Sequence, residues 1–99
     1  MKKSIRQGAI RINADGFTSM FFPERGKTLK LEEAQKIVGG PVEIVYLTDK
    51  CIMIVNEEGK NIGLSYNERA TIIAKAARGI GIGDYIVGDV IMCPSKMFP

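Results

Sequence analysis

Short apolar blocks separated by polar turns run along the chain, and the first two blocks predict a β-hairpin. Strand-like residues fill Ala9 to Ile12 and Phe17 to Phe22. Between them, Asn13-Ala14-Asp15-Gly16 contains the dipeptide Asp-Gly, which is a strong signal for a tight turn. Pro23 then ends the second strand, because proline lacks the amide hydrogen that a sheet ladder requires.

The next block has the spacing of a helix. From Leu31 to Val38, the apolar residues at positions 31, 34, 37 and 38 fall on one helical face. Acidic residues come first and a lysine comes late, as the helix dipole favours. Gly39 suits a left-handed cap, and Pro41 prevents the helix from continuing. We therefore predict a helix over residues 31–38.

Two runs rich in β-branched residues, Val42 to Leu47 and Cys51 to Asn56, predict the strongest strand pair. Odd and even positions are largely apolar in both runs, so both faces of the sheet are expected to be covered. The helices of so small a domain suffice for about one face. The other face is expected to be covered by the amino-terminal hairpin or by a second subunit, and we predict a homo-oligomer.

A turn and a second helix are predicted after this pair. Gly59 supplies the turn, and Lys60 to Leu64 has the character of a short extended segment. Ser65-Tyr66-Asn67-Glu68 has the Ser-x-x-Glu spacing of a capping box, in which the serine oxygen accepts a hydrogen bond from the amide three residues later. A helix from Tyr66 to about Arg78 is predicted to follow.

The glycine run Gly79-Ile80-Gly81-Ile82-Gly83 interrupts that helix. Alternating glycines can form a nest of amides for a phosphate, but this run follows a helix instead of opening one, so a flexible connector is favoured. Tyr85 to Cys93 predicts a last strand. Residues 94–99 are expected to be a tail, either frayed or docked on a neighbour through Met97 and Phe98.

Together these elements predict an α+β fold with a small mixed or antiparallel sheet and two helices. A single domain is expected over residues 1–99, because a chain of 99 residues supports one modest core. Residues 1–16 form an amino-terminal extension and hairpin in this interpretation, and residues 94–99 form the carboxyl-terminal tail.

The composition is that of a globular protein. Hydrophobic residues make up 45% and charged residues 25% of the chain, which argues against wholesale disorder. No apolar run approaches the roughly 18 residues of a membrane helix. No apolar signal segment follows the charged start, Met1 to Gln7. A cytoplasmic protein without a membrane partner is expected.

The charge is mildly basic and concentrated at one end. Fourteen Lys and Arg stand against eleven Asp and Glu, a net charge of +3, and Lys2, Lys3 and Arg6 account for much of the excess. Elsewhere basic residues alternate with acids, whereas a nucleic-acid binder shows an unmixed basic cluster. A nucleic-acid partner is therefore not favoured.

The residues that usually carry catalysis or metal binding are scarce. The chain has no histidine, the commonest general base and a frequent metal ligand. It also has no Cys-x-x-Cys, and Cys51 and Cys93 lie in apolar runs that favour burial. Glu57 and Glu58 are adjacent and point in different directions, which does not suit an acid/base pair. No catalytic residue, metal or cofactor is predicted.

The candidate ligand site is the polar stretch between a strand and a helix, formed by Asn56, Glu57, Lys60, Asn67 and Arg69. Free backbone amides and side-chain donors can converge there on an anionic or nucleobase-bearing ligand. A glycine turn, a helix cap and a solvated helix start require much the same residues. The residues alone leave open whether this stretch is a site or only a turn and a cap.

Several short motifs follow one another in a fixed order along the chain. They are Val38-Gly39-Gly40, Glu43, Asn56-Glu57-Glu58-Gly59-Lys60, Gly63-Leu64, Asn67, Ala70 and Ile86-Val87-Gly88. In this order they resemble a family of small uncharacterised domains carried by phages and mobile elements, a domain of unknown function. The resemblance spans roughly Phe17 to Met92. Ser65 stands where that family usually has proline, and the helix after Ala70 and the glycine run are longer here.

The resemblance implies a phage or mobile-element origin, and no reaction. Our leading hypothesis is a non-enzymatic, homo-oligomeric protein that sequesters a small anionic ligand, such as a cyclic nucleotide signal of host immunity, and so serves immune evasion. One alternative is a protein-binding inhibitor or accessory module that uses a sheet edge or the Met97-Phe98 tail. Another is a nucleic-acid accessory protein that uses Lys2, Lys3 and Arg6.

Overall fold

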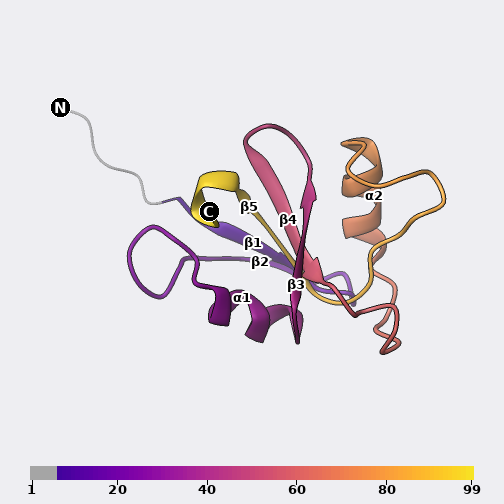
Figure 1. Cartoon of the computed structure of the whole chain (residues 1–99), viewed down its shortest axis with the longest axis horizontal. Helices are drawn as coiled ribbons and strands as arrows, with labels where there is room; N and C mark the ends of the chain where they lie inside the picture. The colour runs from indigo at the N-terminus through magenta and orange to yellow at the C-terminus, as the bar shows by residue number, and fades with distance from the viewer. Residues whose placement is uncertain (1–6) are drawn as a thin grey trace.

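A five-stranded antiparallel sheet forms the centre of the protein, in the order β2-β1-β5-β4-β3 (Figure 1). The structure is a computed structural model and describes residues 7–99. In chain order its elements are β1 (Ala9–Ile12), β2 (Thr18–Phe21), α1 (Leu31–Val38), β3 (Val42–Tyr46), β4 (Cys51–Asn56), α2 (Glu68–Ala76), β5 (Val90–Pro94) and the short 3-10 helix η1 (Ser95–Met97). This confirms the α+β class. Lys2, Lys3 and Arg6 lie outside the described residues.

The last strand joins the two halves of the sheet. The β1–β2 hairpin pairs as Ile10 with Met20, and β3 pairs with β4 as Ile44 with Ile54. Between these pairs lies β5, whose Met92 is opposite Ile10 on one side and Met53 on the other. The hairpin is therefore part of the sheet and does not cover one of its faces.

One face of the sheet packs against α1. Because side chains alternate along a strand, Ile52 and Ile54 of β4 point to this side, where they join Ala34 and Val38 of α1 in one buried cluster. Gly39 ends the helix in the left-handed conformation, with φ of 86°. The sequence-based prediction of this helix and its glycine cap is confirmed.

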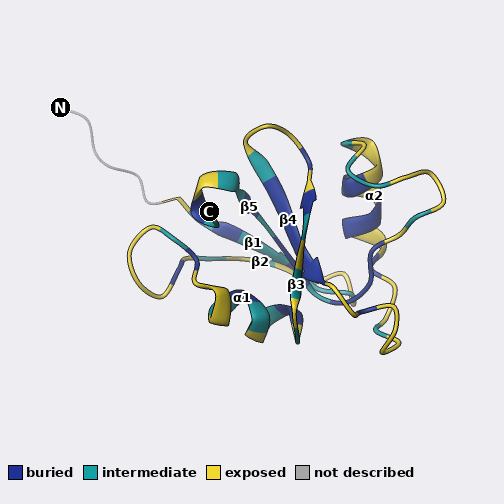
Figure 2. Cartoon of the chain, in the orientation of Figure 1, coloured by how far each residue is buried: buried dark blue, intermediate teal, exposed yellow. Residues whose placement is uncertain are grey.

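The opposite face packs against α2. Met53 and Val55 of β4 point to this side and contact a cluster that includes Ala70 and Ala74 of α2. Figure 2 shows the result as dark blue along β4 and on the sheet-facing side of α2. Helices of the same chain thus pack on both faces of the sheet, and α2 covers only part of its face. Self-association stays a prediction.

The carboxyl-terminal residues pack on their own chain. Met97 is buried in the α1 cluster, and Phe98 packs against it. The backbone amide of Leu29 donates a hydrogen bond to the carbonyl of Met97 at 2.8 Å. The expectation of a frayed tail, or of one docked on a neighbour, is therefore wrong for this structure.

Three predicted element boundaries are wrong. Residues 60–64 form turns and not an extended segment, α2 begins at Glu68 instead of Tyr66, and β5 begins only at Val90. The turns are held by local backbone hydrogen bonds, such as the one from the amide of Leu64 to the carbonyl of Gly59 at 2.9 Å. The start of α2 depends on a long-range contact. Tyr66 forms an isolated bridge with Val87, which keeps the chain extended just before the helix.

Neither helix within residues 7–99 has the length and apolar character needed to cross a membrane.

Candidate functional site

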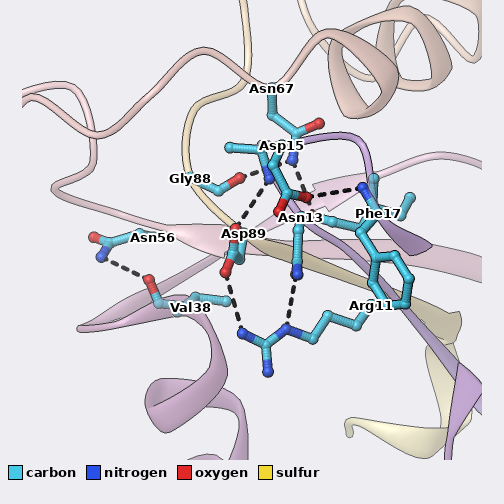
Figure 3. A network of polar contacts seen from close by, with 11 residues as sticks. Arg11, Asn13, Asp15, Phe17, Val38, Asn56, Asn67, Gly88 and Asp89 are labelled. Carbon is cyan, nitrogen blue, oxygen red and sulfur yellow. Dashed lines mark hydrogen bonds and ion pairs between the residues drawn. The ribbon is translucent and has the colours of Figure 1, made fainter. Parts of the chain in front are cut away.

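Asn67 is the centre of a buried polar network (Figure 3). Its side chain is fully buried, and its Oδ1 accepts a hydrogen bond from the amide of Ala70 at 3.0 Å. Its Nδ2 donates to the carbonyl of Ile12 at 3.0 Å and to that of Gly88 at 2.8 Å. One side chain therefore caps α2 and ties it to β1 and to the segment before β5.

Asn67, and not Ser65, is the cap of α2. Its amide donates to the carbonyl of Ile86 at 2.9 Å, while Ser65 accepts a backbone hydrogen bond from Gly88. These two bonds hold residues 65–67 in an extended path beside residues 86–88, so the first helical turn starts after Asn67. The predicted capping box of Ser65 and Glu68 is wrong for this reason.

Asp89 and Arg11 extend the network to the β1–β2 turn (Figure 3). The Arg11 guanidinium pairs with the Asp89 carboxylate at 3.1 Å, and the amide of Ala14 donates to the same carboxylate at 3.0 Å. Asp15 in turn accepts from the amide of Phe17 at 2.9 Å. Within the described chain no buried side-chain polar atom lacks a partner. The network is saturated, which indicates a structural role.

Asn56 is also structural. It is only 5% exposed, its Nδ2 donates to the carbonyl of Val38 at 3.1 Å, and its Oδ1 accepts from the amide of Glu58 at 2.8 Å. The side chain joins the end of α1 to the turn after β4. The side chains of Asn56 and Asn67, the two asparagines of the predicted site, are thus engaged in hydrogen bonds that stabilise the fold.

A cleft of about 680 Å³ lies between β3 and the segment of residues 78–87. This volume is within the range of small-molecule sites, about 300 to 1,000 Å³. Asn56, Glu57 and Lys60 of the predicted site line it, whereas Asn67 and Arg69 do not. Arg69 is exposed elsewhere on the surface.

Lys60 is held on one wall of the cleft. Its ammonium pairs with the carboxylate of Asp84 and lies 4.4 Å from the centre of the Tyr85 ring. The hydrogen bond from Lys60, followed by one from the amide of Tyr85, lowers the pKa of Asp84. Because the pair is half-exposed, we expect it to exchange readily with a ligand.

Arg78 is a cleft residue that the sequence analysis did not select. It is the single non-glycine residue with positive φ in the described range, at 60°. With Arg78 in this conformation, the amide of Gly79 bonds the carbonyl of Ala74 at 2.8 Å, which closes the helix end as a Schellman motif. The sequence held no local signal for Arg78.

Gly79 lies against the edge of β3. A Cβ atom at this position would be 2.6 Å from the carbonyl oxygen of Tyr46 and 2.9 Å from Cγ1 of Val45. No side chain fits there. Gly81 and Gly83, in contrast, face open space. The glycine run therefore forms a wall of the cleft, and the packing of its first residue, Gly79, against β3 holds that wall in place.

The open edge of β3 forms another wall. The amide of Leu47 donates to the carbonyl of Cys51, and the amide of Glu57 donates to the carbonyl of Pro41. Since backbone groups alternate in direction along an antiparallel strand, those of Val42, Ile44 and Tyr46 point outward. They have no neighbouring strand within residues 7–99. Gly79 packs against the carbonyl of Tyr46, and the groups of Val42 and Ile44 are available to a ligand.

The cleft carries both signs of charge. Glu43, Glu57 and Asp84 line it together with the cations Lys60 and Arg78. Of these two cations, only Lys60 makes an ion pair within residues 7–99. Arg78 is thus the cleft cation available to an anionic group.

No metal centre is apparent among residues 7–99, where no group of three or more Cys, Asp or Glu side chains is placed to hold an ion.

The two cysteines are placed as apolar residues. Burial raises the pKa of the Cys51 thiol, and burial together with the nearby Cys51 raises the pKa of Cys93 to about 11. At pH 8 little thiolate is present, and Cys93 is also inaccessible. In the native protein we expect slow modification of Cys51 by a chromogenic disulfide reagent and none of Cys93, with both modified in denaturant. Fast native labelling of Cys93 would contradict this placement.

The fold and the cleft define a small α+β protein in which a cleft large enough for a small molecule lies between an edge strand and a glycine-rich segment. Residues 13–96 match the family described as Domain of unknown function (DUF3846), and the chain belongs to this family. No curated protein and no solved structure matches the chain.

Proposed function

We propose that the protein is a non-enzymatic binding protein that holds a small ligand in the β3 cleft. The ligand carries an anionic group and a planar ring, as a cyclic nucleotide does. Sequestration of such a signal would serve a phage or mobile element against host immunity. The observation that carries the proposal is the conformation of Arg78.

A left-handed backbone at an arginine is unfavourable by about 1 to 2 kcal/mol, and glycine adopts it freely. The chain nevertheless has Arg78 at this position, with glycine at the next residue. Backbone strain of this kind occurs often at functional sites, where the side chain serves a ligand. Arg78 lines the cleft and makes no ion pair within residues 7–99, so in this proposal its charge serves the ligand.

A tyrosine supports a planar group in the ligand. Tyr85 lines the cleft and is 43% exposed. Exposed aromatic rings are platforms on which nucleobases stack, at about 1 to 3 kcal/mol per base. The outward backbone groups of β3 would then hydrogen-bond the edge of the base.

The anionic group has two partners in this proposal. Arg78 offers a planar donor pair that suits a phosphate, and Lys60 turns from Asp84 to share its charge. Glu57 and Glu43 lie at the same cleft and disfavour a ligand with anionic groups on every side. A ligand with one or two phosphates and an uncharged ring fits this distribution best.

The proposal also changes the set of site residues. Lys60 and Glu57 remain from the predicted set, Arg78 and Tyr85 are added, and Asn56, Asn67 and Arg69 have no direct role. Self-association is a further part of the proposal, since the outer edge of β2 is where the sheets of two copies can pair. Light scattering of purified protein tests it, and a monomer at high micromolar concentration would remove that part.

Arg78→Gly is the variant that separates binding from folding. We expect it to raise the free energy of unfolding by up to about 1 kcal/mol through relief of the left-handed strain. We also expect it to weaken ligand binding about ten- to a hundredfold through loss of a charged hydrogen bond. Calorimetry against a panel of cyclic di- and trinucleotides measures the affinity, and urea denaturation measures the stability.

Lys60→Ala is expected to weaken binding to a similar extent, and Arg69→Ala is the matched control. Arg69 is an exposed cation outside the cleft, so its removal should leave affinity unchanged. If no nucleotide in the panel binds, or if Arg69→Ala weakens binding as much as Arg78→Gly does, the cleft proposal fails.

A further inference from the structure

The second helix covers only one end of its sheet face. Side chains of Ile12, Val90 and Val55 lie under α2. Farther along the same face, four side chains come from four adjacent strands: Met20 of β2, Ile10 of β1, Met92 of β5 and Cys51 of β4. We call these four residues the methionine strip.

The methionine strip is open to solvent. Met20 is 69% exposed, and the other three side chains are half-buried. A groove of about 550 Å³ runs over Ile10, Met92 and Cys51. An apolar surface that continues across four strands marks an interaction site more often than scattered apolar residues do.

The rim of this groove is basic. Lys50 and Lys96 line it, and among residues 7–99 no acidic side chain does so. Gln7 also lines the groove. The partner that complements this charge is acidic.

The dimensions of the strip suit a helix. Adjacent strands lie about 4.8 Å apart, so four strands span about 14 Å. An α-helix with its side chains is about 10 to 12 Å wide. A helix laid beside α2 would complete the layer that α2 begins on this face. Two methionines favour such an occupant, because their flexible thioethers adapt to an apolar helix face.

We propose that the methionine strip docks an acidic amphipathic helix of a partner protein. The apolar stripe of that helix packs on Met20, Ile10 and Met92, and its carboxylates lie near Lys50 and Lys96. This interaction uses a different surface from the β3 cleft and is independent of it. The sequence analysis named a protein-binding inhibitor or accessory module as an alternative function. The methionine strip is a defined surface for that function, and it replaces the sheet edge and the tail considered there.

The test uses the full chain and two labelled peptides of about 18 residues, long enough for about five helical turns. Both carry leucine at positions i, i+3, i+4 and i+7. The remaining positions are glutamate in one, the glutamate peptide, and lysine in the other, the lysine peptide. Fluorescence anisotropy is expected to show binding of the glutamate peptide at least about tenfold tighter than that of the lysine peptide, with affinity falling as salt rises. Equal affinities, or no binding of the glutamate peptide, would overturn the proposal.

Variants locate the binding surface. The double variant Lys50→Glu/Lys96→Glu is expected to weaken binding of the glutamate peptide about tenfold. Met20→Glu, at a highly exposed position, should abolish this binding while the circular dichroism spectrum stays native. Lys75→Glu on α2, exposed and outside the groove, is the matched control and should have little effect.

Two results would assign the strip to another occupant and so overturn the proposal. In the first, the protein self-associates and Met20→Glu makes it monomeric, which identifies a second copy on the strip. In the second, a short DNA duplex competes with the glutamate peptide and binds more tightly, which identifies nucleic acid.

Discussion

Replacement of Asn67 by alanine is expected to lower the free energy of unfolding by at least about 3 kcal/mol. The side chain satisfies the buried carbonyls of Ile12 and Gly88 and the amide of Ala70. Each group left without a partner costs about 1 to 3 kcal/mol, and loss of a helix cap costs about 1 kcal/mol. The total free energy of unfolding of a small domain is only about 5 to 15 kcal/mol, so the Asn67→Ala variant should unfold far more easily.

Urea denaturation followed by circular dichroism measures this effect, and Ser65→Ala is its control. Ser65 is exposed, and only its backbone carbonyl bonds Gly88. The alanine variant should therefore lie within about 0.5 kcal/mol of the parent chain. If Ser65→Ala lowered the free energy of unfolding by about 1 kcal/mol and Asn67→Ala left it unchanged, Ser65 would be the helix cap. That result would contradict the role of the Asn67 network.

Gly79→Ala is expected to destabilise the protein by about 1 to 3 kcal/mol and to remodel the β3 cleft. The new methyl carbon would meet the carbonyl oxygen of Tyr46 at 2.6 Å, well inside van der Waals contact. That oxygen belongs to the backbone of β3, so the glycine segment must move away from the strand. Ligand affinity in the cleft is expected to fall with the stability.

Gly81→Ala is the matched comparison two residues later. Nothing lies within 4 Å of a Cβ atom at Gly81, and its backbone does not require glycine. The substitution should be neutral, or should stabilise by about 0.4 to 1 kcal/mol by restricting the unfolded chain. If Gly79→Ala and Gly81→Ala destabilise the protein equally, the whole glycine run requires flexibility. The packing contact between Gly79 and Tyr46 would then not be the cause of the destabilisation.

The partial success of the sequence-based site has a physical explanation. Lys60 and Glu57 follow β4 after a short turn, so their position at its end could be inferred from the strand pattern. Asn56 and Asn67 have the same polar character, but their donors are consumed by carbonyls 18 and 55 residues away. A sequence pattern cannot show whether an amide meets a ligand or a distant backbone group.

By itself the sequence determined the elements whose causes are local. The Asp-Gly turn between β1 and β2, the amphipathic spacing of α1 with its Gly39 cap, and the two apolar runs of β3 and β4 each depend on contacts within a few residues. Only the tertiary structure decided the placement of β5 between β1 and β4, the start of α2 at Asn67, and the left-handed backbone of Arg78. These features depend on hydrogen bonds and packing between segments far apart in the chain. The energy of such contacts outweighs the weak local propensities of residues 60–90, which is why the cleft formed there was not visible in the sequence.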